Sequence, residues 1–173
     1  MNVNWVTELL NLWTFVTGVI VLVSIIAYQT RYKKVFQDVY TKYYFQLGFF
    51  VSTLATLGSL YYSEVLAYAP CVLCWYQRIF MYPISILFII AAVKRSAVYV
   101  RLNSMVLAAV GAVFSLYHYF IQMQDTGSVA CSTVGYTVSC SEYFSVSYGY
   151  VTIPMMAFTA FIVIILLGWI NKD

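Results

Sequence analysis

The residues best suited to chemistry are Cys71 and Cys74, which are separated by two positions, and Arg78, which follows one turn later. A Cys-x-x-Cys pair closes a small, reducible ring, so it is usually redox-active or metal-binding. Pro70 and Cys71 stand directly before a long apolar run, which predicts a helix N-terminus, where the helix dipole stabilises a thiolate. The three positions i, i+3 and i+7 share one helix face. We therefore expect Arg78 to favour the thiolate of Cys74 and to attract an anionic electron acceptor.

A second pair, Cys131 and Cys140, lies in a polar stretch rich in Ser, Gly and Thr. Taken alone, this pair favours a structural disulfide, which an oxidising exterior permits. Beside a Cys-x-x-Cys pair it also suits a shuttle, because thiol–disulfide exchange needs a mobile pair that reaches both an external protein and the first pair. A zinc site built from all four cysteines is a weaker alternative, because Cys131 and Cys140 are nine positions apart instead of about two to four.

The elements that must position these residues follow from the composition. Of 173 residues, 63% are hydrophobic and only nine Lys or Arg and six Asp or Glu carry a formal charge, whereas an ordinary soluble domain is about 25% charged. So few charges cannot cover the surface of a soluble domain. The composition excludes a soluble globular domain, a disordered chain and a nucleic-acid-binding protein. It leaves an all-α integral membrane protein, because the apolar runs are too long and too even for barrel strands.

Charge-free runs of about the length that crosses a bilayer predict five transmembrane helices in a single membrane domain over 1–173: 11–29, 43–62, 76–93, 102–122 and 151–170. A cleaved signal peptide is a weak alternative for the first run, because no Lys or Arg precedes it and it is long for such a peptide. The short loops predict one compact bundle surrounded by membrane lipid.

The placement of charge orients the predicted spans. Eight of the nine basic residues fall on one side and four of the six acids on the other, so the positive-inside rule places the N-terminus outside and the C-terminus in the cytoplasm. Two outward loops, 63–75 and 123–150, then hold the cysteines in or beside them. Arg78 is the basic exception, inside the third span, where it costs desolvation unless something uses it. The only histidine, His118, ends the fourth span, as an interfacial residue or as a hydrogen-bond partner of a ligand carbonyl.

Three strings carry a family resemblance. Cys71-Val-Leu-Cys-Trp-Tyr-Gln-Arg78 reads C-x-L-C-x-Y-x-R directly into a span, and His118-Tyr-Phe-Ile-Gln122 and Thr152-Ile-Pro154 lie at the later spans. Together with the second cysteine pair, these strings resemble the DsbB family of membrane disulfide-generating proteins, including the shorter Gram-positive relatives often called BdbC. The resemblance covers about 43–170.

The resemblance implies a four-helix bundle of the bacterial cytoplasmic membrane, with its active cysteines on the extracytoplasmic side. Such a protein oxidises a thioredoxin-like extracytoplasmic thiol oxidase and passes the electrons to a membrane quinone, either menaquinone or ubiquinone. Cys71 and Cys74 are implied to be the quinone-coupled pair, in which Cys74 faces the quinone ring and Cys71 exchanges with the second pair. Arg78 is implied to hold the quinone and stabilise its reduced anion, and His118 to lie on the quinone side.

The resemblance also implies that Cys131 forms the mixed disulfide with the partner and that Cys140 resolves it. Two features depart from the family pattern: the additional span at 11–29 and the shortness of the second loop, which weakens this division of roles. Three alternatives stay open. A vitamin K epoxide reductase-like protein has its quinone-side pair after the loop pair, a protein that carries reductant outward has its redox cysteines inside the spans, and a membrane scaffold has two structural disulfides.

Overall fold

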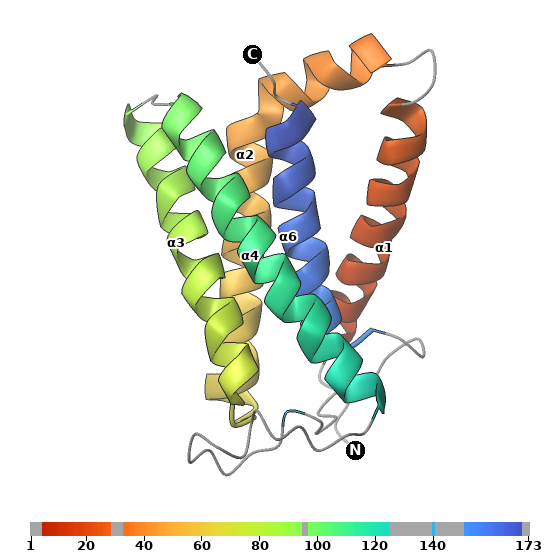
Figure 1. Ribbon diagram of the computed structural model, residues 1–173, viewed down its shortest axis with the longest axis vertical. Coiled ribbons are helices and arrows are strands. Elements are labelled where there is room, and N and C mark those ends of the chain that lie inside the picture. The colour runs from red at the N-terminus through yellow and green to blue at the C-terminus, as the bar shows by residue number, and fades with distance from the viewer. Residues whose placement is uncertain (1–4, 29–32, 95–96, 125–139, 141–150, 171–173) are drawn as a thin grey trace.

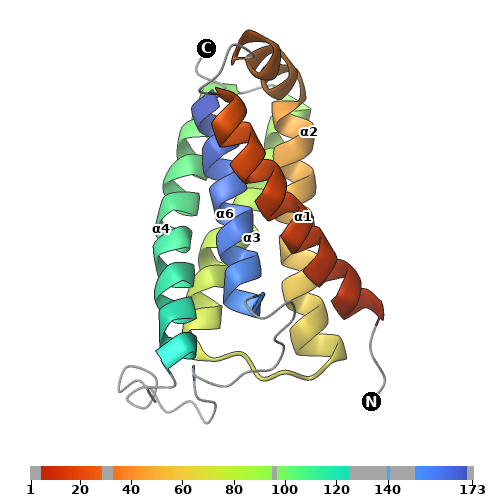
Figure 2. The ribbon, with the colours of Figure 1, turned by 90° about the vertical axis from the view of Figure 1, so that its right-hand side faces the viewer.

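The chain is all-helical in the part that the computed structural model describes, residues 5–28, 33–94, 97–124, 140 and 151–170. Its elements are α1 (Trp5–Tyr28), α2 (Lys33–Leu60) with a π-helical turn η1 (Tyr61–Val65), α3 (Val72–Lys94), α4 (Ala97–Gln124) and α6 (Ile153–Ile170). Helices α2, α3, α4 and α6 pack together as an antiparallel bundle, and α1 lies obliquely against α2 and α6 (Figures 1 and 2). The predicted all-α class is confirmed.

Four segments of the described helices are long and apolar enough to cross a membrane: Trp5–Ser24, Val72–Ala91, Tyr99–Gln124 and Ile153–Ile170. Four such segments among the described residues support a multi-pass membrane protein. Helix α2 has 28 residues, but the tyrosine, serine, threonine and glutamine side chains of its charge-free part lower the mean hydropathy and keep it outside this set. A fifth span formed by α2, and the orientation of the chain across the membrane, therefore stay predictions.

The helices extend beyond the predicted spans, and the boundary before α3 was predicted wrongly. We expected an outer loop over 63–75, but η1 ends at Val65 and α3 begins at Val72, so Cys74 lies in the first helical turn. The physical reason is that charge-free runs mark only the hydrocarbon core. Backbone hydrogen bonding continues past that core, as in the bond from the Trp75 N–H to the Cys71 carbonyl oxygen at 3.2 Å.

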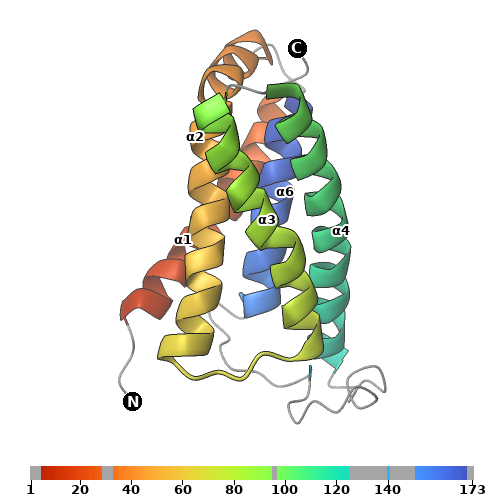
Figure 3. The ribbon, with the colours of Figure 1, turned by 90° about the vertical axis from the view of Figure 1, so that its left-hand side faces the viewer.

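The two ends of the bundle carry different features. The start of α1, the connection from η1 to α3 and the end of α4 lie at the end marked by the N-terminus, and the C-terminus lies at the other (Figures 1 and 3). Helix α2 begins at Lys33 and α3 ends at Lys94, both at the C-terminal end of the bundle. The fold thus separates basic helix ends from the Cys-x-x-Cys pair, in keeping with the charge pattern of the sequence.

Two phenylalanines hold the bundle together by packing against glycines. Phe88 of α3 and Phe161 of α6 are fully buried. A methyl group added to Gly48 of α2 would overlap the Phe88 ring, and one added to Gly111 of α4 would overlap the Phe161 ring. Small residues at such contacts let membrane helices approach closely, so these contacts set the spacing of the helices that carry the cysteines.

We expect Gly111→Ala to destabilise the bundle by about 1–3 kcal/mol, the usual cost of overpacking a filled core. The buried Phe161 ring must move to admit the new methyl group. Gly18→Ala in α1 is the matched control, because no atom lies within 4 Å of the position of its added methyl group. Unfolding of the purified variants by sodium dodecyl sulfate in mixed micelles measures the difference. Equal stability of the two variants would contradict the close packing of α4 on α6.

Candidate active site

Cys71 occupies the N-cap position of α3. Its carbonyl oxygen accepts the first hydrogen bond of the helix, from the Trp75 N–H. The backbone N–H of Cys74 donates to the Cys71 sulfur, which is the bond that a capping side chain makes with the third residue of a helix. The predicted location of the pair at a helix N-terminus is confirmed, and Cys71 is the residue that caps it.

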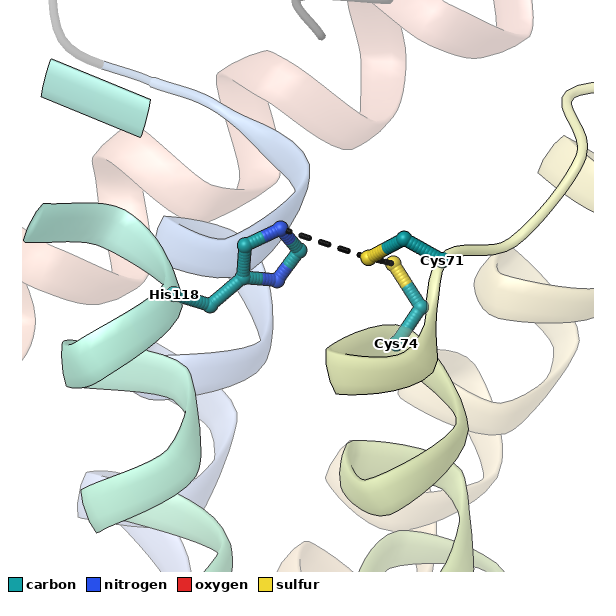
Figure 4. Close-up of side chains that lie close together, drawn as sticks. All are labelled: Cys71, Cys74 and His118. Carbon is teal, nitrogen blue, oxygen red and sulfur yellow. Dashed lines mark hydrogen bonds between the residues drawn. The ribbon is translucent and has the colours of Figure 1, made fainter. Parts of the chain in front are cut away.

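The Cys71 sulfur is enclosed between a second thiol and an imidazole. Cys71 and Cys74 are free thiols whose sulfurs lie 3.4 Å apart, so one thiol donates a hydrogen bond to the other. His118 of α4 approaches from the opposite side, with its Nε2 3.6 Å from the Cys71 sulfur (Figure 4). Cys71 is 3% exposed and His118 is 2% exposed. Solvent therefore does not compete with these contacts.

Both ring nitrogens of His118 are engaged. The Gln77 amide nitrogen donates to Nδ1 at 3.0 Å, and Nε2 lies 3.2 Å from the Cys140 carbonyl oxygen. A carbonyl oxygen only accepts, so Nε2 carries a proton. This N–H is directed at both Cys140 and Cys71. Gln77 thus holds the imidazole in the tautomer that donates toward the sulfur of Cys71.

Gln77 is a positioning residue that the sequence analysis missed, although it lies within the C-x-L-C-x-Y-x-R string. It is buried, with 6% of its side chain exposed. A signal was present, because an amide inside a predicted span must find a polar partner. Its partner lies 41 positions further along the chain, and helix periodicity cannot reveal so distant a contact.

These contacts favour a thiolate at Cys71. The pKa of Cys71 is lowered to about 4. The largest cause is the hydrogen bond from the Cys74 thiol, the contact with His118 lowers the pKa further, and burial opposes both. We had expected the thiolate at Cys74, stabilised by Arg78. The structure differs because the helix N-cap, the neighbouring thiol and the imidazole all converge on the Cys71 sulfur.

Arg78 has other partners. Its Nε donates to the Ser59 hydroxyl at 3.0 Å and its Nη2 to the Ser59 carbonyl oxygen at 3.2 Å. The guanidinium carbon lies 5.3 Å from the centre of the Trp75 ring. Arg78 therefore links α3 to the end of α2.

A cavity of about 130 Å³ lies between α1, α2, α3 and α6, and Cys74, Arg78 and Ser59 are part of its wall. The described residues that line it do not include Cys71 or His118. The expected common face therefore holds for Cys74 and Arg78, whereas Cys71 turns toward α4. His118 lies beside Cys71 and does not line this cavity, and its place on the quinone side stays a prediction.

Cys140 is the described member of the second pair. It is disulfide-bonded and 1% exposed, and it packs in one cluster with Cys71, Leu73 and Ile121. The structure thus places part of the second pair directly beside the first. Cys131 lies outside the described residues.

Metal binding is the other chemistry open to this cluster. Cys71, Cys74 and His118 each offer one donor atom, and these atoms lie within 4.8 Å of one another. The nitrogen that faces the sulfurs carries a proton, however, whereas a metal needs its lone pair. Cys140 offers no thiolate because it is disulfide-bonded, and a thiolate is the metal ligand. The four-cysteine zinc site therefore does not fit, and the arrangement suits thiol redox chemistry.

Comparison with known families agrees with the geometry. Residues 41–171 match the family model described as "Disulfide bond formation protein DsbB". The chain belongs to the DsbB family. The resemblance seen in the sequence is confirmed, and this DsbB-family chain is a membrane thiol–disulfide oxidoreductase that acts in disulfide bond formation.

Curated relatives of this DsbB-family chain carry matching names. The SPbeta prophage-derived disulfide bond formation protein B of Bacillus subtilis (strain 168) is 41% identical over 133 residues, 75% of this chain and 85% of the relative. Probable disulfide formation protein C 1 of Bacillus cereus is 47% identical over 120 residues, 69% of this chain and 84% of the relative. Probable disulfide formation protein C of Halalkalibacterium halodurans is 45% identical over 119 residues, covering 68% and 85%. No solved structure matches the chain.

The DsbB match contains the cysteines, Arg78 and His118, but it begins inside α2. Helix α1 therefore lies outside it. Even so, α1 contributes Leu10, Trp13, Thr14 and Thr17 to the wall of the cavity beside Cys74. This chain thus adds to the cavity beside Cys74 an element that the family match does not cover.

Proposed function

We propose that this protein reoxidises a thioredoxin-like extracytoplasmic thiol oxidase and passes the electrons to a membrane quinone. The observation that supports this function is the division of the Cys-x-x-Cys pair. Cys71 lies beside His118 and the disulfide-bonded Cys140, whereas Cys74 and Arg78 line a cavity. One dithiol therefore has a protein disulfide on one side and space for a small acceptor on the other.

The proposed exchanges balance in electrons and protons. The dithiol of the partner reduces the Cys131–Cys140 disulfide and becomes a disulfide itself. The resulting Cys131–Cys140 dithiol reduces the Cys71–Cys74 disulfide through attack by a thiolate and a mixed-disulfide intermediate. As the Cys71–Cys74 disulfide closes, the pair gives up two electrons and the proton of the Cys74 thiol, because Cys71 is already a thiolate. A bound quinone would take up these two electrons and this proton, with a second proton from water. Free thiols at Cys71 and Cys74 with a disulfide-bonded Cys140 correspond to the state after the second exchange.

The contacts of Cys71 favour this direction of electron flow. A stabilised thiolate stabilises the reduced form of a pair, and a pair whose reduced form is stable is a stronger oxidant. The His118 N–H and the N-cap position both act on the Cys71 thiolate. They therefore help the Cys71–Cys74 disulfide to take electrons from the second pair.

The cavity beside Cys74 suits a quinone ring. Its wall is mainly apolar, with polar groups from Ser59, Arg78 and Thr14, and such pockets bind apolar rings that a few polar groups orient. Arg78 gives two of its five N–H donors to Ser59, and further donors suit a carbonyl oxygen or the charge of a reduced acceptor. The same residues would accommodate a ubiquinone or a menaquinone ring.

We expect Cys71 and Cys74 to accumulate as free thiols when quinone is withdrawn and the reduced partner is supplied, because electrons then enter the pair and cannot leave. Acid quenching, alkylation with a mass-tagged maleimide and peptide mass spectrometry count these thiols. Restoring quinone should return the pair to a disulfide, with one hydroquinone formed per pair. A membrane scaffold with structural disulfides would keep both pairs oxidised throughout, and that outcome would overturn the proposed function.

A further inference from the structure

Helix α1 is docked on the bundle by specific contacts, although the family match does not include it. Trp13 packs edge-to-face against Phe50 of α2, with ring centres 5.5 Å apart. The hydroxyl groups of Ser24 and Tyr40 are 2.8 Å apart and share a hydrogen bond. On the opposite face of α1, Val23 is 54% exposed. The helix therefore presents one defined face to α2 and α6, as its crossing over them in Figure 2 shows.

Two cavities lie under this face of α1. The first is the 130 Å³ cavity whose wall includes Cys74 and Arg78. The second has a volume of about 400 Å³ and lies between α1, α2 and α6, toward the end of the bundle where α6 ends. Its wall is almost entirely aliphatic and aromatic, and the hydroxyls of Ser24 and Tyr40 in that wall bond to each other. The second cavity therefore suits an apolar occupant.

The two cavities adjoin. Trp13 and Thr17 of α1, Val51 of α2 and Val163 of α6 line both of them. The space under α1 thus changes character along the helix, from a redox end with an arginine and a thiol to a larger apolar end. The volume of the second cavity, about 400 Å³, is within the range of about 300–1,000 Å³ that is usual for ligand pockets.

We propose that α1 completes a prenyl-binding cavity. The ring of a membrane quinone occupies the first cavity, and its isoprenoid tail occupies the second, between α1, α2 and α6. This inference rests on the proposed function and assigns a role to α1. A prenylated quinone joins a ring with polar oxygens to a branched apolar tail, which is the order of polarity that the adjoining cavities offer.

The tail is bound by packing and not by the hydrophobic effect. Surrounding lipid is as apolar as the cavity wall, so transfer of the tail from lipid to protein gains little from removal of water. Close contact with the rigid wall supplies dispersion energy. We therefore expect a moderate contribution of the tail site to affinity, about tenfold in the dissociation constant.

Filling the second cavity tests this inference. Val21→Trp on α1 and Leu166→Trp on α6 introduce an indole from two different walls of the cavity. Val23→Trp adds the same group to the exposed face of α1 and is the matched control. Purified protein in detergent micelles is incubated with menaquinone-4 or menadione, which has the same ring without the tail. A second pair of probes is ubiquinone-4 and ubiquinone-0. Protein-bound quinone is separated by size exclusion, extracted and quantified.

We expect both filling variants to bind the tailed quinone about tenfold more weakly, to bind the tailless ring as the wild type does, and Val23→Trp to match the wild type with both probes. Unchanged binding of the tailed quinone overturns the inference and leaves a lipid acyl chain as the occupant. An equal loss for tailed and tailless probes also overturns it, because α1 then only shapes the ring site. If one filling variant does not fold, the other gives the answer. A wild-type protein that binds no quinone refutes the proposed function itself.

Discussion

Replacing Cys74 with serine should abolish quinone reduction by the reduced partner, with turnover falling by about 10³-fold or more, because no second sulfur remains to close the disulfide. The structure places Cys74 in the wall of the cavity beside Arg78, so the substitution removes the sulfur nearest the proposed acceptor. Quinone absorbance, followed with purified protein and reduced partner, measures the loss. Unchanged turnover in Cys74→Ser would contradict the assignment.

The matched variant Cys71→Ser should lose turnover equally but trap a different species. In Cys74→Ser, the Cys71 thiolate still attacks the disulfide of the second pair and releases one of its thiols, but the mixed disulfide cannot react forward because position 74 has no thiol. Cys71 lies in one cluster with Cys140, so this linked species should accumulate. It should be absent from Cys71→Ser. Mass spectrometry of peptides from unreduced protein distinguishes the two variants, and linked peptides in both would show that the two cysteines do not have separate roles.

The second large effect should appear in the acid–base behaviour of Cys71. Its pKa is lowered to about 4, chiefly by the Cys74 thiol, so its thiolate persists across the neutral range and is lost only as the pH falls through this value. The rate of Cys71 alkylation by iodoacetamide in reduced protein should therefore have its midpoint near this pKa. An ordinary thiol has a pKa of about 8.5. Peptide mass spectrometry separates the Cys71 product from that of Cys74.

His118→Ala should move this midpoint upward, because the loss of an N–H donor to the thiolate disfavours the charged form. Part of the lowering should remain, since the Cys74 thiol is its largest cause. At a pH below both midpoints, the alkylation rate of the variant should be about tenfold lower than that of the wild type for each pH unit by which the midpoint rises. Gln77→Leu should raise the midpoint by a smaller amount, because His118 keeps its place but loses the partner of Nδ1.

Ser115→Ala is the matched control for these variants. Ser115 is a buried residue of α4 close to His118 in sequence, and its hydroxyl donates to the Gly111 carbonyl oxygen of its own helix at 2.9 Å. Its removal should leave the alkylation midpoint in place. If His118→Ala also had the wild-type midpoint, His118 would not act on Cys71. Gln77 would then have no positioning role, because it acts through His118.

Local features of the sequence were sufficient for the fold class, the family and the position of the first cysteine pair. Composition indicates which medium surrounds the helices. Only 15 of the 173 residues carry a formal charge, so that medium is lipid. The spacing of Cys71 and Cys74 after Pro70 places the pair at a helix start, because capping involves residues only three or four positions apart. Such properties depend on neighbours in the chain and need no knowledge of which helices pack together.

The division of labour between the two cysteines depends on the tertiary structure. Periodicity placed Cys71, Cys74 and Arg78 on one face, but a face of α3 meets α4 on one flank and the cavity on the other. The choice of neighbour follows from helix packing, in which Phe161 fits against Gly111 and Phe88 against Gly48. These contacts join residues far apart in sequence, and they bring His118 to Cys71 and leave Arg78 with Ser59.

Helix α1 is the clearest case of an element whose neighbours cannot be predicted from the sequence. The sequence alone predicts an additional apolar span and offers no partner for it, because an apolar helix in lipid has no hydrophobic reason to choose one neighbour over another. Its place is set by shape and a few polar contacts, such as Trp13 on Phe50 and Ser24 on Tyr40. Those contacts exist only once α1 is packed against α2. They place α1 beside the redox cavity, where it encloses space that the four-helix bundle would leave open to lipid.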